Sequence, residues 1–403
     1  MDINIRLYVQ RPGPFRFFSL PAKLVCSTLF SDFWSPLCHS PHPLIAKVSN
    51  MKSSCALSTL AAASMPWAAL ACSRVVYHAE VDDRIVIGRS MDFVQDTNTT
   101  IWAFPAGMKR NGAIEDNPVE WTSKYGSITA LMYDIVYSEG LNTEGLTSSI
   151  LYLGGSDYGE RNSSEPGIFI GLWLQYVLDN YATVEETVND LCSGEKIQVV
   201  KKAFLDGVNS VGHLIVTDKG GDNVIMEYID GKLNCFHSSE YDVVTNEPTY
   251  PEQLAINTYW EPISNWTLPG SARPADRFAR LSHYNQYVPG ANDSETAVAY
   301  AAGMIRAVSD PMVPNEMIFA AGENDIWPTL WRTYIDVQSN DMYYESATSP
   351  MSFWWDVDAF DLGVGGPLRS LKVSGVPWQE RMGEVTNAFV DTDEPPAVGH
   401  RKP

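Results

Sequence analysis

The residue best suited to nucleophilic chemistry is a cysteine that follows a predicted cleavage site. Residues 69–72 read Ala69-Leu70-Ala71-Cys72, the small-x-small pattern that signal peptidases cut. Cleavage after Ala71 leaves Cys72 with a free α-amine, whose unperturbed pKa is about 7.7–8.0. That amine can take the thiol proton as general base, so the thiolate can attack an amide carbonyl and form a thioester that water hydrolyses. The same chemistry needs hydrogen-bond donors for the oxyanion.

The residues before Cys72 also indicate export. Lys52 follows Met51, and residues 55–70 form an apolar run shorter than the about 20 residues that span a bilayer. We therefore predict a signal peptide over 51–71 and a periplasmic or secreted product. Residues 1–50 are rich in proline and lack helical or strand periodicity, which predicts a non-native extension with translation starting at Met51, or a disordered segment.

Two other interpretations of Cys72 stay open. Bacterial lipoprotein signals also place a small residue directly before a cysteine, although they usually carry leucine where this chain has Ala69. In that case Cys72 is a lipid anchor with a blocked amine on a non-catalytic fold. Alternatively, Cys72 works with one of the later histidines in a papain-like Cys/His hydrolase.

Composition excludes several function classes. The net charge of −21 disfavours binding to nucleic acid or to anionic lipid, and 45% hydrophobic residues suit a large core. No dinucleotide-binding, Walker, HExxH or GxSxG motif is present, and the histidines lack metal-ligand spacing, so we predict neither cofactor nor metal. After cleavage three cysteines remain, which predicts a reactive Cys72 and a candidate pair, Cys192 with Cys235. Two unpaired buried cysteines are the alternative.

The first elements after the cleavage site bring candidate residues together. Residues 72–79 alternate as a strand, Asp82-Asp83 form a turn, and a return strand starts at Ile85. Such a hairpin sets Arg89 and Asp92 within side-chain reach of Cys72.

Later patterns predict strands and helices without regular alternation. Strands are predicted over 101–106, 125–137, 145–153, 211–217, 223–229 (extended toward His237), 331–338 and 342–346. A turn is predicted over 139–145. Helices are predicted over 168–181, 184–191, 275–287 and 295–308, the second with Thr183 as N-cap and Glu186 in a capping box. This order favours an α+β layered fold in one domain over 72–390, followed by a disordered tail over 391–403.

Five separated segments resemble the choloylglycine hydrolase/penicillin V acylase family, N-terminal-nucleophile hydrolases that cleave linear amide C–N bonds. They are Cys72-Ser73-Arg74, Gly88-Arg89-Ser90-Met91-Asp92-Phe93, Gly140-Leu141-Asn142-Thr143-Glu144-Gly145-Leu146, Val244-Thr245-Asn246-Glu247-Pro248-Thr249-Tyr250 and Asp276-Arg277-Phe278-Ala279-Arg280. The resemblance runs from Cys72 to roughly residue 380. It implies a four-layer αββα sandwich of antiparallel sheets and an exported amidase.

The resemblance also implies roles for single residues. Cys72 is the expected nucleophile and, through its amine, the base. Asp92 is expected to accept hydrogen bonds from that amine, and Arg89 to hold the thiolate and substrate region electrostatically. Asn246 is the expected oxyanion donor, and Arg277 joins the same charged cluster.

Tyr152 bears on the substrate. Bile salt hydrolases of the family carry asparagine at this strand position, so tyrosine favours the penicillin V acylase side. Phenoxyacetyl penicillins and N-acyl homoserine lactones are thus the expected substrates, with conjugated bile acids as the alternative. Tyr133, Tyr152 and the Trp102/Phe104 strand are candidates for an aromatic acyl pocket. Family members are commonly tetramers, so the resemblance implies a homotetramer.

Overall fold

The computed structural model describes the chain from Ala71 onward. Described are residues 71–194, 196–205, 208–313, 327–377, 380 and 382–398. All described residues belong to one compact unit. The predicted extension and, except for Ala71, the predicted signal peptide lie outside the described residues. The predicted tail is described as far as Val398.

Sheet A carries the predicted hairpin at its centre. Its strand order is β16-β1-β2-β17-β18-β19-β21, with every pair antiparallel except β19–β21. In chain order the strands are β1 (Ala71–His78), β2 (Ile85–Asp92), β16 (Val243–Val244), β17 (Thr329–Asp336), β18 (Asp341–Ser346), β19 (Ser352–Asp356) and β21 (Gly383–Glu384). The hairpin prediction for β1 and β2 is confirmed.

Sheet B is larger and antiparallel throughout. Its order is β15-β14-β13-β8-β7-β6-β3-β20-β22. The strands are β3 (Thr100–Phe104), β6 (Ser127–Met132), β7 (Val136–Asn142), β8 (Thr147–Leu151), β13 (His213–Thr217), β14 (Asn223–Ile229), β15 (Lys232–His237), β20 (Arg369–Lys372) and β22 (Val390–Asp391).

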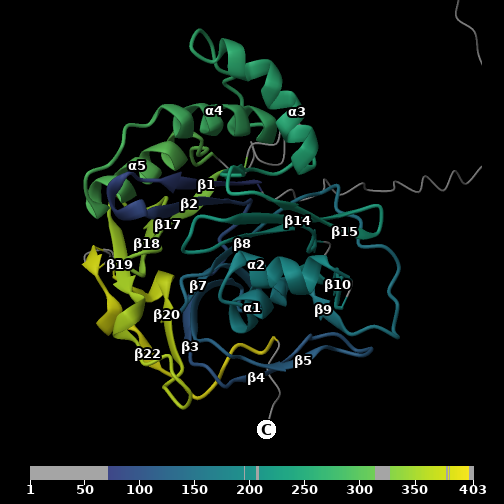
Figure 1. Cartoon of the computed structure of the whole chain (residues 1–403). Coiled ribbons are helices and arrows are strands. Elements are labelled where there is room, and N and C mark those ends of the chain that lie inside the picture. Colours follow the sequence, from purple (N-terminus) through teal and green to yellow (C-terminus); the bar gives the residue numbers. More distant parts are fainter. Residues whose placement is uncertain are drawn as a thin grey trace, which may run out of the picture. The chain divides into compact units, whose positions relative to one another are not determined.

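Helices cover the outer faces of the two sheets (Figure 1). The helices are α1 (Ile170–Asn180), α2 (Val184–Thr187), α3 (Tyr250–Trp260), α4 (Pro274–Tyr287) and α5 (Ser294–Ala307). α4 and α5 pack on β1 and β2 of sheet A, α3 packs on α4, and α1 packs on β6, β7 and β8 of sheet B. The layers are therefore helix, sheet, sheet, helix, which confirms the αββα prediction.

Short elements complete the described chain. Three small two-stranded pairings join β4 (Lys109–Asn111) with β5 (Glu120–Thr122), β9 (Gly167–Phe169) with β10 (Gln198–Val200), and β11 (Ala203–Leu205) with β12 (Val208–Asn209). Single turns of 3₁₀ helix are η1 (Val81–Asp83), η3 (Glu261–Ile263), η4 (Val357–Ala359), η5 (Val373–Gly375) and η7 (Thr386–Ala388), and η2 (Val188–Cys192) is a π-helix.

The central strands are buried on both faces. Every residue of β2 is buried, because one face meets the helices and the other meets sheet B. The alternation expected for residues 72–79 is therefore not an alternation of buried and exposed faces, since Arg74, Val75 and Val76 are all buried. Gly88 allows this packing: a Cβ there lies 2.8 Å from Ile305 Cγ1 of α5, closer than real Cβ contacts.

One predicted strand is wrong in its extent. Residues 125–137 divide into β6 and β7 at a turn where Tyr133 and Asp134 have φ of 54° and 53°. Two-residue hairpin turns of this kind usually carry Asn or Gly, so tyrosine gave no signal. Consequently Glu139 lies in β7 and not in the predicted 139–145 turn, which is shorter and contains Gly145 at φ 82°.

The helix predictions hold with two differences. Thr183 caps α2, since its side chain accepts from Glu186 N–H, but the Glu186 carboxylate accepts from Ala182 N–H, one residue before the position that a capping box requires. The predicted 184–191 helix continues as the π-helix η2. α3 was not predicted, because its sequence lacks an amphipathic pattern, although the proline in its first turn and the capping box of Thr249 with Glu252 are helix-start signals.

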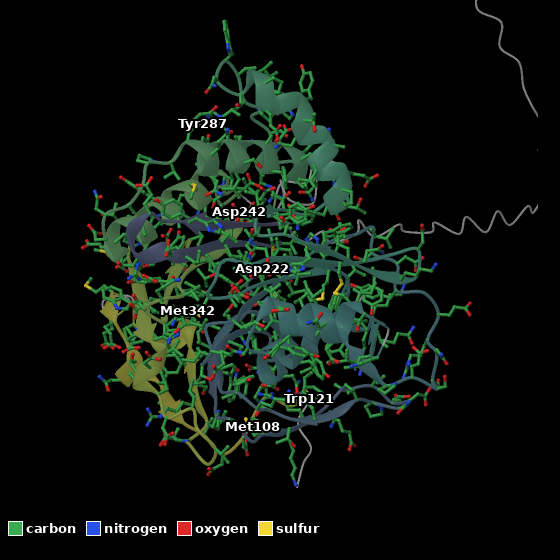
Figure 2. All side chains as sticks on the ribbon, in the orientation of Figure 1. Met108, Trp121, Asp222, Asp242, Tyr287 and Met342 are labelled. Atoms are coloured by element: carbon green, nitrogen blue, oxygen red, sulfur yellow. A yellow bond between two sulfur atoms is a disulfide. The ribbon has the colours of Figure 1, made fainter. Side chains whose placement is uncertain are left out.

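The candidate cysteine pair is confirmed. Cys192 of η2 and Cys235 of β15 form a disulfide, drawn as a yellow bond between two sulfur atoms in Figure 2. It joins the end of the α2 region to an outer strand of sheet B. Among the described cysteines this leaves Cys72 as the free thiol.

Candidate active site

The strand register distributes the candidate residues over the two faces of sheet A. Cys72 is paired with Met91, Arg74 with Arg89, and Ala71 with Asp92. Because side chains alternate along a strand, Cys72 and Arg89 point between the sheets, whereas Asp92 points toward the helices. The main chain of Cys72 lies between the side chains that face sheet B and those that face the helices.

The thiol of Cys72 is buried beside a guanidinium. Cys72 is 1% exposed, and its Sγ lies 3.7 Å from Arg89 Nη2 and 4.0 Å from Met91 Sδ. Burial raises the pKa of the Cys72 thiol above its usual value. The Arg89 charge opposes this shift, the Asp92 carboxylate adds to it, and the Asp92 backbone N–H and Arg277 oppose it.

Arg89 is held on three sides. Its Nε lies 3.7 Å from Glu139 Oε2 on β7, and its Cζ lies 4.5 Å from the centre of the Trp331 ring on β17. Its Nη2 donates to Ile150 O at 3.3 Å. Arg89 and Glu139 are fully buried, and burial raises the pKa of the Glu139 carboxyl against the charges of Arg89 and Arg74. The guanidinium is thus fixed beside the sulfur.

Asn246 and Arg277 surround the main chain of Cys72. Asn246 Oδ1 accepts from Cys72 N–H at 2.7 Å and from Arg277 Nη2 at 2.7 Å. Asn246 Nδ2 donates to Tyr152 O at 2.8 Å. Arg277 Nη1 donates to Cys72 O and to Ser73 Oγ, both at 2.6 Å. An amide nitrogen carries two hydrogens, so Asn246 keeps a second one for an oxyanion.

Asp92 carries a buried carboxylate oxygen without a hydrogen bond among the described residues. Its Oδ1 accepts from Thr329 Oγ1 at 2.6 Å, and its Oδ2 lies 4.0 Å from Arg277 Nη1. Burial raises the pKa of Asp92, and the Arg277 charge and the Thr329 hydrogen bond oppose the shift. A buried oxygen of this kind is suited to accept a new donor.

A small apolar cavity of about 30 Å³ adjoins the thiol. Cys72, Met132, Ile150 and Tyr152 are among its lining residues. Its volume is that of one or two water molecules, so an acyl group can enter only if these side chains move. Burial is the main cause that raises the pKa of the Tyr152 phenol to about 12, and the Glu247 charge adds to it. The phenol therefore stays neutral at physiological pH.

The other pocket candidates lie elsewhere. Trp102 and Phe104 stack on one another with ring centres 5.7 Å apart, and the Trp102 ring N–H donates to Asp134. The Tyr133 hydroxyl accepts from Gln95. Of these candidates Tyr152 lines the cavity at Cys72, and Tyr133, Trp102 and Phe104 do not. Phe104 and Trp102 are needed in the core of sheet B.

The structure thus brings Cys72, Arg89, Asp92, Asn246 and Arg277 to one place. Sequence reasoning missed residues that contact them: Glu139, Thr329 and Trp331. Glu139 directly precedes the third segment, but it was assigned to a turn. No local pattern marks the others, since their partners are distant in the chain.

The described residues include no group of three or more His, Cys, Asp or Glu side chains arranged to hold a metal ion. In the same part of the chain no helix is long and apolar enough to cross a membrane.

Comparison with known families decides the relationship. Residues 72–369 match the model of the linear amide C–N hydrolases, choloylglycine hydrolase family. The chain belongs to this family. A choloylglycine hydrolase-type enzyme hydrolyses linear amide C–N bonds, and the αββα layers and the clustered segments described above agree with that membership.

Individual relatives are penicillin V acylases and a bile acid hydrolase. Penicillin V acylase of Pectobacterium atrosepticum is 37% identical over an alignment of 339 residues that covers 77% of this chain and 88% of that protein. The solved penicillin V acylase of Agrobacterium tumefaciens is 37% identical with a TM-score of 0.72, covering 82% of this chain and 100% of that chain. A variant of conjugated bile acid hydrolase from Clostridium perfringens shares the fold, with 20% identity and a TM-score of 0.61 over 75% of this chain and 97% of that chain.

Proposed function

We propose that the chain is an exported amidase whose nucleophile is Cys72 after cleavage at Ala71–Cys72. One observation carries the proposal: the sulfur and the main-chain nitrogen of Cys72 both lie inside the cluster, the sulfur beside Arg89 and the nitrogen bonded to Asn246. The family match also begins at residue 72. Burial favours the protonated thiol, so catalysis needs a base close by, and a freed α-amine on the same residue supplies it.

The reaction follows from these positions. The amine of Cys72 takes the thiol proton, and Sγ attacks the substrate carbonyl to form the S–C bond. Asn246 Nδ2 donates its second hydrogen to the oxyanion. As the C–N bond breaks, the ammonium group returns the proton to the leaving amine, and water then hydrolyses the thioester with the amine as base. Arg89 stabilises the thiolate and Asp92 Oδ2 accepts from the amine.

The mature N-terminus tests this mechanism. Intact-mass analysis of the exported protein is expected to give a chain beginning at unmodified Cys72. A diacylglyceryl adduct there supports instead a lipoprotein with a blocked amine. Cys72→Ala is expected to abolish turnover, and so is a retained methionine ahead of Cys72. Full activity of the methionine-blocked protein contradicts the amine as base and supports a papain-like Cys/His arrangement.

For the substrate we propose a penicillin V-like acyl amide, with N-acyl homoserine lactones as a related class. The 37% identical relatives are penicillin V acylases, and Tyr152 lines the cavity at the thiol. A panel of penicillin V, a long-chain acyl homoserine lactone and glycocholate, followed by free-amine release, tests this. Highest kcat/KM on glycocholate supports a bile acid hydrolase instead.

We also propose a homotetramer in the periplasm, as the family resemblance implies. Light scattering of the purified mature protein measures the mass, which is expected to be four times that of one chain. A monomeric mass contradicts this proposal without affecting the mechanism.

A further inference from the structure

His213, the first residue of β13, is fully buried. It contacts Thr245, the residue directly before the candidate oxyanion donor Asn246. Its Nε2 lies 2.9 Å from Thr245 O, the carbonyl that precedes Asn246 in the chain. Its Nδ1 lies 2.8 Å from Glu227 Oε1 of β14. A carbonyl oxygen can only accept, so Nε2 carries a hydrogen and donates it, and the ring nitrogen on the other side shares a hydrogen bond with the carboxylate.

Glu227 is itself fixed in place. It is fully buried, and its two oxygens lie 3.1 and 3.0 Å from Tyr250 N, an N–H in the first turn of α3. The first N–H groups of a helix lack partners within it and favour a negative charge. The carboxylate therefore links the start of α3 to the ring of His213, and the ring orientation follows from it.

The ring bridges two sheets at the active site. His213 is paired with Leu151 on β8 of sheet B, and the next residue, Tyr152, accepts from Asn246 Nδ2. Thr245 follows β16, the strand that pairs with β1 of sheet A. One imidazole thus connects sheet B to the segment that carries Asn246.

We propose that His213 is a positioning residue for the amide of Asn246. The Thr245–Asn246 peptide group is planar, so a bond to its oxygen sets the orientation in which Asn246 leaves the main chain. From that orientation Asn246 Oδ1 reaches Cys72 N and Nδ2 reaches Tyr152 O. This inference rests on the proposed role of Asn246 as oxyanion donor.

Other contacts fix neighbouring atoms without replacing this one. Thr245 Oγ1 lies 2.9 Å from Gln253 Oε1 and 3.0 Å from Pro274 O, two acceptors that share its single hydrogen, and Gln253 Nε2 donates to Asn246 O. These bonds hold the side chain of Thr245 and the carbonyl of Asn246. The side chain that donates a hydrogen bond to the carbonyl of Thr245 is that of His213.

The test compares turnover with chemistry that needs no oxyanion. His213→Phe removes both ring nitrogens, including the donor to Thr245 O, and His213→Gln keeps an amide donor for that carbonyl. The readouts are kcat and KM on penicillin V, or on whichever panel substrate is turned over, the alkylation rate of Cys72 by iodoacetamide, and Tm. His237→Gln is the matched control, because His237 is a histidine of the same sheet paired with a carboxylate, Asp222 at 2.7 Å, near the surface.

We expect kcat to fall by about 100-fold in His213→Phe, the scale reported for a displaced or lost oxyanion donor, with KM within about 3-fold of the parent. Alkylation of Cys72 stays within about 2-fold, because thiol alkylation develops no oxyanion. His213→Gln is expected to lie between the parent and His213→Phe, and His237→Gln to match the parent.

Three outcomes overturn the inference: unchanged kcat in His213→Phe, alkylation that falls in parallel with kcat, or failure of both His213 variants to fold, which assigns the residue to global stability. Asn246→Ala separates this inference from the proposed function. If Asn246→Ala is inactive and His213→Phe is active, only the inference fails. If Asn246→Ala keeps full turnover, the role proposed for Asn246 fails.

Discussion

Glu139 offers the sharpest perturbation of the thiol environment. Its carboxylate lies 3.7 Å from Arg89 and also interacts with the charge of Arg74. Glu139→Gln keeps the shape of the side chain and removes its charge, which leaves two buried guanidinium groups with less compensation. Two properties should change together: the stability of the fold and the pKa of Cys72.

The structure sets the sign of the stability change. At 3.7 Å two unit charges attract by ~4 kcal/mol with an effective dielectric constant of about 20. Burial nevertheless raises the pKa of Glu139, so desolvation of the ionised carboxylate costs more than the two guanidinium charges return, and the ionised form lowers the stability of the fold above pH 4.5. The Tm of Glu139→Gln should therefore rise at pH 8 and stay unchanged near pH 3.

The direction of the thiol shift follows from charge. The Arg89 guanidinium lowers the pKa of Cys72, and Glu139 partly compensates that guanidinium. Without the carboxylate the thiolate is favoured more strongly, so the midpoint of the alkylation rate against pH should move to lower pH. The assay is the rate of iodoacetamide modification from pH 5 to 10, with a thermal melt at each pH.

Glu345→Gln is the control. Glu345 is a nearly buried carboxylate that pairs with Arg332 at 2.8 Å and with Arg306 rather than with Arg89. It should lower Tm without moving the alkylation midpoint. An unchanged midpoint in Glu139→Gln, or an equal shift in both variants, would refute the assignment of Arg89 and Glu139 as the pair that sets the thiol pKa.

Three further outcomes are expected. Because burial raises the pKa of Asp92, its ionised form costs stability above pH 3.8 and not below. Asp92→Asn should therefore raise Tm at pH 8 and leave it unchanged near pH 3, although it should abolish turnover. A lower Tm at pH 8 contradicts this sign. Replacing both Cys192 and Cys235 by serine opens a 43-residue separation and should cost about 4 kcal/mol in urea unfolding with kcat retained; loss of kcat in the folded variant speaks against a purely stabilising disulfide. Gly88→Ala places a Cβ 2.8 Å from Ile305 Cγ1 and should lower the free energy of unfolding by about 1–3 kcal/mol. An unchanged melting curve would show that α5 moves away without destabilising the fold.

The hairpin and the family segments could be predicted because they are local. A strand, an acidic turn and a return strand bring Arg89 and Asp92 near Cys72 without long-range contacts, whereas the register that pairs Arg89 with Arg74 comes from the structure. The segment with Asn246 and the α4 segment with Arg277 could be named from resemblance alone. Their contacts with Cys72 span 174 and 205 positions, and no pattern in one sequence encodes such a distance.

The residues that support the site were out of reach for a related reason. Glu139 had to be recognised as a strand residue, and that required a turn at Tyr133 whose positive φ the sequence does not signal. His213 carries no signal in the sequence, because the histidines lack metal-ligand spacing. Its importance appears only when β13, β14 and the start of α3 are placed around it.

Ala71 belongs to β1 and is paired with Asp92, so the Ala71–Cys72 bond lies inside a formed sheet. A protease binds its substrate as an extended chain and uses the same backbone groups that β2 occupies here. If this bond is cleaved as we propose, cleavage must therefore come before folding. Timing then becomes part of the enzyme's biogenesis: a precursor that folds first hides its own cleavage site and stays without a free amine, however complete the rest of the cluster is.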